Sequence, residues 1–190
     1  MIVDNQQPRQ VVGGIGGLLA GSAGNLWVVA ADAVYRVTPG GQAQAVLALP
    51  PVRQSPVLLA LPDGGLLLAH GDRPQRQLLL FAPDGTLRWE RALGAQVVGD
   101  AALWLLNGRP YLLASGQTTG PTLFAVDLDT PRLRRVWQGG TRTPLPIYTW
   151  SFPVTTEITQ SGAEGLVVRI ESLLIQTGGG VLALVVPPVE

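Results

Sequence analysis

The residues that could do acid–base chemistry gather in one short segment, HGDRPQR at 70–76. His70 is the chain's one histidine, and Asp72 could orient it as a general base. The segment lies between two apolar runs, so we interpret it as a loop. We favour a solvated loop histidine, because no second catalytic partner is identifiable. Arg73 and Arg76 could bind an anion or an acidic partner, but ordinary loop arginines are the favoured interpretation.

Other chemistries are limited by what the sequence lacks. There is no cysteine, so disulfides, thiolate metal sites and cysteine nucleophiles are impossible. A single histidine excludes a zinc site built on several histidines. Asp127 and Asp129 could contribute to a calcium site, but calcium needs six or more oxygens, and turn hydrogen bonding is the favoured interpretation. We therefore predict no catalytic residue, no cofactor, no cofactor-binding residue and no metal site.

The composition excludes two classes of protein. Hydrophobic residues make up 46% of the chain and charged residues 14%, which excludes a disordered chain. Thirteen basic residues, all arginine, balance 13 acidic residues, so the formal net charge is zero. A nucleic-acid binder usually carries a basic excess, and we therefore predict no nucleic-acid partner. The absence of lysine, with much Ala, Leu and Gly, is typical of bacterial genomes of high GC content.

The elements that carry these residues repeat along the chain. GLLAGSAGNL at 17–26 aligns without a gap with VLLALPDGGL at 57–66. ALWLLNGRPY at 102–111 aligns with that second copy, also without a gap, and GLVVRIESLL at 165–174 follows with one deletion. Each copy is an apolar run, a turn and a second apolar run. The pattern predicts short strands joined by tight turns.

The copies indicate a fold class. Four apolar runs follow one another in each of the first three units, and no stretch shows a capped helical period. Four-stranded antiparallel units that recur every 40 to 45 residues are typical of β-propeller blades. We predict an all-β single domain over 1–190, a β-propeller-like array of about four blades. The expected blades are about 15–50, 55–95, 99–140 and 164–190 with 1–12, and 141–163 is an irregular insertion.

Two segments also resemble a known family. They resemble the repeats of pyrroloquinoline-quinone-type (quinoprotein-like) β-propellers. The first segment is LFAVDLDT at 123–130, which is followed by Trp137, and the second is LFAPDGTLRWE, which contains Trp89. In those repeats an Ala-x-Asp strand leads through a turn to a tryptophan that docks on the neighbouring blade. The resemblance covers about residues 15–140. It implies a fold and inter-blade tryptophans rather than a quinone cofactor. Pro131 stands where the family prefers glycine, and Trp137 comes two residues late.

The segment at 11–31 has three interpretations. It holds no charge and is long enough to span a membrane, but its six glycines disfavour a helix. Its likeness to the later copies favours strands. The leader MIVDNQQPR, in which Asp4 cancels Arg9, makes a poor signal peptide. A membrane anchor stays an alternative for 11–31, and for localisation we favour the periplasm or cell envelope.

The predicted architecture limits the function. A closed four-blade ring has no open blade face, whereas half of a larger ring would expose two apolar faces. We expect a non-enzymatic scaffold or accessory subunit that binds a protein partner or its own copy. The alternatives are a propeller that binds a sugar or a quinone, an enzyme remnant, and a membrane-anchored accessory subunit that uses 11–31.

Overall fold

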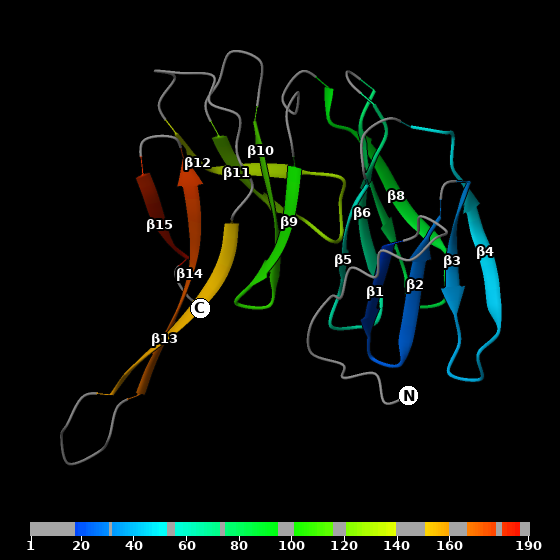
Figure 1. Cartoon of the computed structure of the whole chain (residues 1–190), viewed down its shortest axis with the longest axis horizontal. Coiled ribbons are helices and arrows are strands. Elements are labelled where there is room, and N and C mark those ends of the chain that lie inside the picture. The colour runs from blue at the N-terminus through cyan, green and yellow to red at the C-terminus, as the bar shows by residue number, and fades with distance from the viewer. Residues whose placement is uncertain are drawn as a thin grey trace. The chain divides into compact units, whose positions relative to one another are not determined.

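A computed structural model gives the structure of the chain, and every regular element in it that we describe is a β-strand (Figure 1). The structure describes residues 18–30, 32–52, 56–72, 75–94, 101–115, 121–139, 151–159, 167–177 and 180–186. Within these ranges no helix is long and apolar enough to cross a membrane. The prediction of an all-β chain is confirmed.

Two four-stranded antiparallel sheets belong to the first compact unit, which comprises residues 1–97 and 127–132. Sheet A contains β1 (Leu18–Ser22), β2 (Asn25–Val29), β3 (Ala33–Val37) and β4 (Ala43–Ala48). Sheet B contains β5 (Val57–Ala60), β6 (Leu66–His70), β7 (Gln77–Phe81) and β8 (Leu87–Ala92). In both sheets the order in space follows the order in sequence, which is the arrangement of a propeller blade.

The second compact unit comprises residues 98–126 and 133–190 and contains two more sheets. Sheet C contains β9 (Ala101–Leu106), β10 (Arg109–Ser115), β11 (Pro121–Val126) and β12 (Leu133–Gln138). Sheet D contains β13 (Ser151–Thr159), β14 (Val167–Thr177) and β15 (Gly180–Val186), and β9 contacts β13 and β14. Sheet C is a third meander of the same kind, so the structure is a propeller-like array of antiparallel sheets.

Tight turns end the strands where the sequence places glycine and aspartate. Gly64 and Gly85 have φ of +91° and +95°, a region that side chains with a Cβ rarely adopt. Asp63 precedes the first of these glycines and accepts a hydrogen bond from the Gly65 backbone N–H at 2.9 Å. Asp84 does the same for the Thr86 N–H at 2.9 Å. At the end of each pair of strands, these side-chain hydrogen bonds satisfy backbone N–H groups that no longer have a partner on the neighbouring strand.

The core of the first unit lies between sheets A and B. Trp27 of sheet A is fully buried and its ring centroid lies 5.8 Å from that of Phe81 in sheet B. Such tilted aromatic contacts stabilise a core beyond their buried area. The other buried members of this cluster are Val29, Val34, Leu49, Leu66, Leu68 and Leu79. Both sheets therefore contribute to one core, as stacked blades do.

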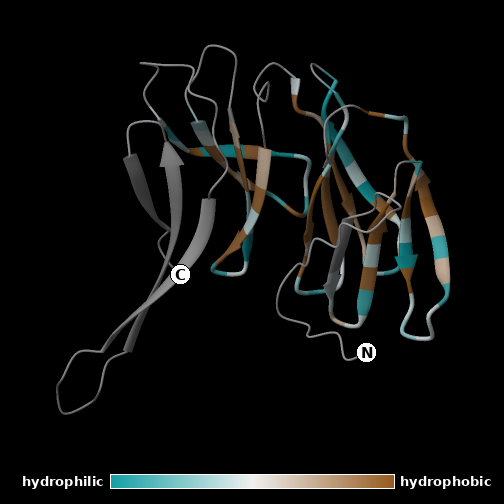
Figure 2. Cartoon of the chain, in the orientation of Figure 1, coloured by the Kyte–Doolittle hydropathy of each residue, from teal (hydrophilic) through white to brown (hydrophobic). Residues whose placement is uncertain are grey.

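The last strands of sheets B and C, β8 and β12, carry several arginines, whereas the inner strands of sheet B, β6 and β7, are mostly apolar (Figure 2). Every residue of β6 is buried, whereas β8 carries Arg88, Glu90 and Arg91 and is half-exposed. Charge on an edge strand disfavours pairing with another chain. A β-bulge interrupts the pairing of the last two strands in sheets A, B and C.

Several details of the prediction are revised or stay open. A membrane helix over 11–31 is wrong for residues 18–29, because these form the antiparallel pair β1 and β2. The turn predicted within 165–174 is also wrong, because Val167–Thr177 forms one strand. The strand expected from residues 1–12 lies outside the described residues. Most of the predicted blade limits also lie outside the described residues. The single domain over 1–190 stays a prediction.

We predict that Gly85→Ala lowers the free energy of unfolding more than Gly41→Ala. Both glycines have positive φ, so alanine is strained at either by about 1–2 kcal/mol. A Cβ on Gly85 would also lie 2.8 Å from Val46 Cγ1 of sheet A, whereas a Cβ on Gly41 meets no described atom within 4 Å. Overpacking adds roughly 1–3 kcal/mol. Urea denaturation measures both losses, and equal losses would contradict the contact between Gly85 and β4.

Candidate functional site

Ionisable side chains meet at the connection between β6 and β7. His70 is the last residue of β6 and pairs with Gln77 at the start of β7. Gly71 has a φ of +106°, and a Cβ there would lie 3.0 Å from the Gln75 carbonyl oxygen. The two arms of the connection therefore pass close together. Only a residue without a Cβ fits this position at low cost.

Both basic side chains of this cluster are buried. His70 is 5% exposed and Arg76 is 3% exposed, while Asp72 is half-buried. Leu93, which follows β8, donates its backbone N–H to the Arg76 carbonyl oxygen at 2.8 Å. The chain that leaves sheet B is thereby fixed beside the cluster.

Burial is the largest cause of a lowered pKa at His70, and the positive charge of Arg76 lowers it further. The carboxylate of Asp72 acts in the opposite direction. Because desolvation penalises the charged form, the imidazole is neutral at pH 7. A neutral imidazole can donate one hydrogen bond and accept one, and it carries no charge that would attract an anion.

The favoured sequence interpretation of these residues is wrong in two places. His70 is not a solvated loop histidine, because it is the last residue of the inner strand β6 and is buried. Arg76 is buried rather than a surface arginine. Arg73 lies outside the described residues. A general base must reach the proton that it removes, and an imidazole 5% exposed at a strand end offers a substrate little surface.

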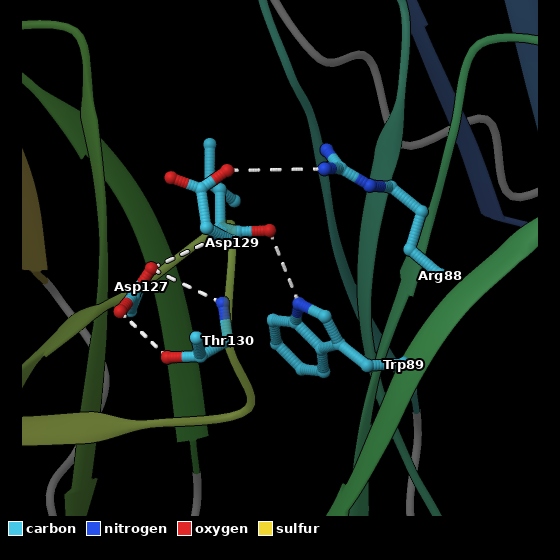
Figure 3. A network of polar contacts seen from close by, with 6 residues as sticks. Arg88, Trp89, Asp127, Asp129 and Thr130 are labelled. Atoms are coloured by element: carbon cyan, nitrogen blue, oxygen red, sulfur yellow. Dashed lines mark hydrogen bonds and ion pairs between the residues drawn. The ribbon is translucent and has the colours of Figure 1, made fainter.

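Asp127 organises a turn. Its side chain accepts hydrogen bonds from the backbone N–H of Asp129 at 2.9 Å and from the Thr130 N–H at 3.2 Å. The Thr130 hydroxyl donates to its second oxygen at 2.7 Å (Figure 3). The Thr130 hydroxyl, followed by the Asp129 N–H, lowers the pKa of Asp127. The described residues contain no group of three or more acidic or histidine side chains that could hold a metal.

A second set of polar side chains fixes sheet A to sheet B. Trp27 donates its indole N–H to the Gly64 carbonyl oxygen at 3.0 Å, within the buried core. Asn25 donates its amide to the same oxygen at 3.1 Å and to the Pro83 carbonyl oxygen at 3.1 Å. Arg36 donates to the Asn25 amide oxygen at 3.3 Å, which orients that amide. We call this set of bonds, with the apolar core beside it, the A–B seam.

The same kind of bond recurs at β8. Trp89 donates its indole N–H to the Leu128 carbonyl oxygen at 3.2 Å, and Arg91 donates to the Pro131 carbonyl oxygen at 2.6 Å. The acceptors lie in the turn at 127–132, which belongs to the first compact unit. Arg88 also lies 3.8 Å from Asp129, both largely exposed, and such a pair contributes little (Figure 3).

Trp89 has the docking role, whereas the docking of Trp137 on the next sheet stays a prediction. Trp89 pairs with Leu80 and Trp137 pairs with Leu123, in each case directly beside a β-bulge. Trp137 packs beside the cluster formed by Leu106, Tyr111, Leu113 and Leu123 in its own unit.

Sequence reasoning identified the tryptophans and missed Asn25 and Arg91. The signal is available in hindsight, since the bonded residues are separated by 37 to 40 positions, close to one repeat. A polar side chain in one repeat that is bonded to a turn in the next must show this spacing.

Comparisons with known proteins place the chain in no named family. No protein-family model matches it, and no curated protein matches it. Among solved structures it is similar to puromycin hydrolase, with 20% identity, a TM-score of 0.44, and coverage of 80% of this chain and 24% of the other. A GH43 glycoside hydrolase gives 16% identity, a TM-score of 0.39, and coverage of 94% and 42%.

A third similar structure is TolB from Acinetobacter baumannii, with 12% identity, a TM-score of 0.45, and coverage of 90% of this chain and 43% of the other. The chain spans less than half the length of each of these three structures. At these TM-scores the likenesses carry no argument about function. The fold class rests on the strand order within the sheets.

We predict that the protein loses stability as the pH falls below about 6.5, the ordinary pKa of histidine. The folded state holds His70 neutral at a lowered pKa, so the unfolded state binds more protons in this range. Urea denaturation between about pH 5 and pH 8 measures the slope. His70→Gln is the control and should flatten it. A wild-type slope of the opposite sign would contradict the buried neutral imidazole.

We predict that Trp89→Phe costs about 1 kcal/mol, the usual net value of one hydrogen bond. Phenylalanine keeps an aromatic ring but cannot donate to the Leu128 carbonyl oxygen. Trp137→Phe is the matched control, because the Trp137 indole donates no hydrogen bond within the described residues. Thermal or urea unfolding compares the two variants. A larger loss at Trp137 than at Trp89 would refute the docking role of Trp89.

Proposed function

We propose that this chain is a non-enzymatic β-propeller-like module that acts as a scaffold or accessory subunit and binds protein. One observation carries the proposal. The polar side chains that reach between sheets, Asn25, Trp27 and Trp89, donate to backbone carbonyls of turns. They therefore hold the fold together rather than line a reaction site, which leaves binding through a surface as the supported activity.

The buried ionisable cluster supports the same proposal. His70 and Arg76 are almost inaccessible, and the imidazole is neutral because of its burial and the adjacent guanidinium. Catalysis by this pair would need an opening of the β6–β7 connection. A role in fixing the end of sheet B needs no such opening and agrees with the bond from Leu93 to Arg76.

We further propose that the repeats are of the quinoprotein type. The turn held by Asp127 and Thr130 and the docking of Trp89 on that turn support this assignment. The proposal concerns the repeat alone and includes no quinone. Binding of a sugar or a quinone, and descent from an enzyme, stay alternatives from the sequence.

The proposed function predicts a stoichiometric protein complex that does not require His70. The full chain, tagged and expressed at its native level, is cross-linked in its host and the complex is sized. We expect a complex of fixed stoichiometry that forms equally with His70→Gln. The purified chain is also assayed against ester, glycoside and peptide probes, and no turnover is expected. Turnover that His70→Gln abolishes while the fold persists would refute the proposal.

A further inference from the structure

The turn between β9 and β10 consists of Asn107 and Gly108. Leu106 pairs with Arg109 on either side of it, so only two residues join the strands. Both turn residues have positive φ, +48° at Asn107 and +70° at Gly108. Positive φ at both positions is characteristic of a type I′ hairpin turn, for which Asn-Gly is a preferred sequence. The hairpin therefore places an asparagine directly before an exposed glycine.

An asparagine that precedes a glycine can react with its own backbone. The backbone nitrogen of the glycine attacks Cγ of the asparagine side chain, and the amide nitrogen leaves as ammonia with the proton of the glycine N–H. The product is a cyclic imide, which water then opens. Addition of water at the side-chain carbonyl gives aspartate. Addition at the main-chain carbonyl gives isoaspartate, in which the chain continues through the side chain. Glycine favours the attack because it has no Cβ to crowd its nitrogen.

The attacking nitrogen is accessible in this turn. Gly108 and Arg109 are exposed, and Asn107 is half-buried. A Cβ on Gly108 would meet no described atom within 4 Å, so the space around this glycine is open. Among the residues that the structure describes, no backbone carbonyl accepts the Gly108 N–H. Attack by this nitrogen therefore breaks no hydrogen bond of the described backbone.

Two Asp-Gly pairs in the turns of sheet B could form the same imide, but their geometry opposes it. The pairs are Asp63–Gly64 and Asp84–Gly85. Each glycine N–H donates to the carbonyl oxygen three residues earlier, at 2.9 Å and 3.0 Å respectively. The hydrogen bond from the Thr86 N–H lowers the pKa of Asp84, and a carboxylate is a poorer electrophile than an amide. In both turns the nitrogen is engaged, unlike that of Gly108.

Asn25 is the other asparagine within the described residues, and its amide is held in place. It donates to the Gly64 and Pro83 carbonyl oxygens at 3.1 Å each, and its oxygen accepts a bond from Arg36 at 3.3 Å. The next residue is Leu26 in β2, not a glycine. Both the electrophile and the nucleophile are therefore fixed at Asn25, which makes this residue an internal reference.

We propose that Asn107 is a self-modification site, at which the Gly108 nitrogen and water convert the asparagine to aspartate and isoaspartate in the folded chain. No oxidant, cofactor or second protein takes part. The site and its chemistry do not depend on the proposed binding function. The modification adds one negative charge at the tip of the hairpin, next to Arg109.

The two products differ in what they do to the hairpin. Aspartate keeps the backbone length, and Asp-Gly also suits a type I′ turn. Isoaspartate adds a backbone carbon to a two-residue turn whose length sets the register of β9 and β10. Leu106 and Tyr111 of this hairpin are buried in one cluster, and β9 contacts β13 and β14 of sheet D. Isoaspartate should therefore loosen the hairpin and its contacts with sheet D.

The test is peptide mapping by mass spectrometry of the purified full chain, aged at mildly alkaline pH under conditions in which circular dichroism shows it folded. Asn25 and Asn107 fall on separate peptides after cleavage at arginine, so one sample reports both. We expect Asn107 to react about tenfold faster than Asn25 or more, because an amide bonded within the A–B seam must first be released by unfolding.

Asn107→Gly is the matched variant. Glycine also adopts positive φ, and Gly-Gly is accepted in a type I′ turn, so the hairpin persists without an amide. The main acidic species that ion exchange separates from the aged wild type should be absent from this variant. An Asn107 that reacts no faster than Asn25, or an unchanged acidic species in Asn107→Gly, would overturn the assignment.

Hydrogen exchange tests the effect on the hairpin. The isoaspartate fraction of the aged wild type is compared with Asn107→Asp, which adds the same charge without the extra backbone carbon. We expect the amides of β9 and β10 to exchange faster in the isoaspartate fraction alone. Equal exchange in the two samples would overturn the claim that the modification loosens the hairpin.

Discussion

The carbonyl oxygen of Gly64 accepts two side-chain hydrogen bonds from the preceding sheet, one from the Trp27 indole and one from the Asn25 amide. Trp27 is fully buried, so its N–H must find an acceptor, and an unsatisfied donor there would cost about 1–3 kcal/mol. That requirement fixes the turn of sheet B against β2. The packing of the two apolar faces follows from this placement, because the indole also contacts Phe81.

The next repeat is joined by the same kind of hydrogen bond, made by different residues. At β8 the donors are Trp89 and Arg91, and the acceptors lie in the turn that Asp127 holds together. In each case a side-chain donor meets a backbone carbonyl of a turn.

The sequence predicted the strands and turns of three sheets well, because apolar runs bounded by Gly, Asp and Asn determine them locally. It failed where placement depends on distant contacts. His70 looked like a loop residue because its neighbours are polar, but it belongs to β6, which lies between two other strands of sheet B, and it is buried. The acceptor of the Trp89 indole could not be placed from the sequence, because the Leu128 carbonyl oxygen lies 39 positions away. Asn25 gave no local signal, because its acceptors lie 39 and 58 positions away.

Hydrogen exchange of the tryptophan indole N–H groups, followed by NMR, tests the seam most directly. The five tryptophans give separate signals within one sample. We expect the Trp27 indole proton to exchange only through global unfolding, since it is buried and bonded to the Gly64 carbonyl oxygen. The Trp89 proton should show partial protection, because its bond to the Leu128 carbonyl oxygen is only partly buried. A Trp27 indole proton that exchanges as fast as a free indole would contradict the account.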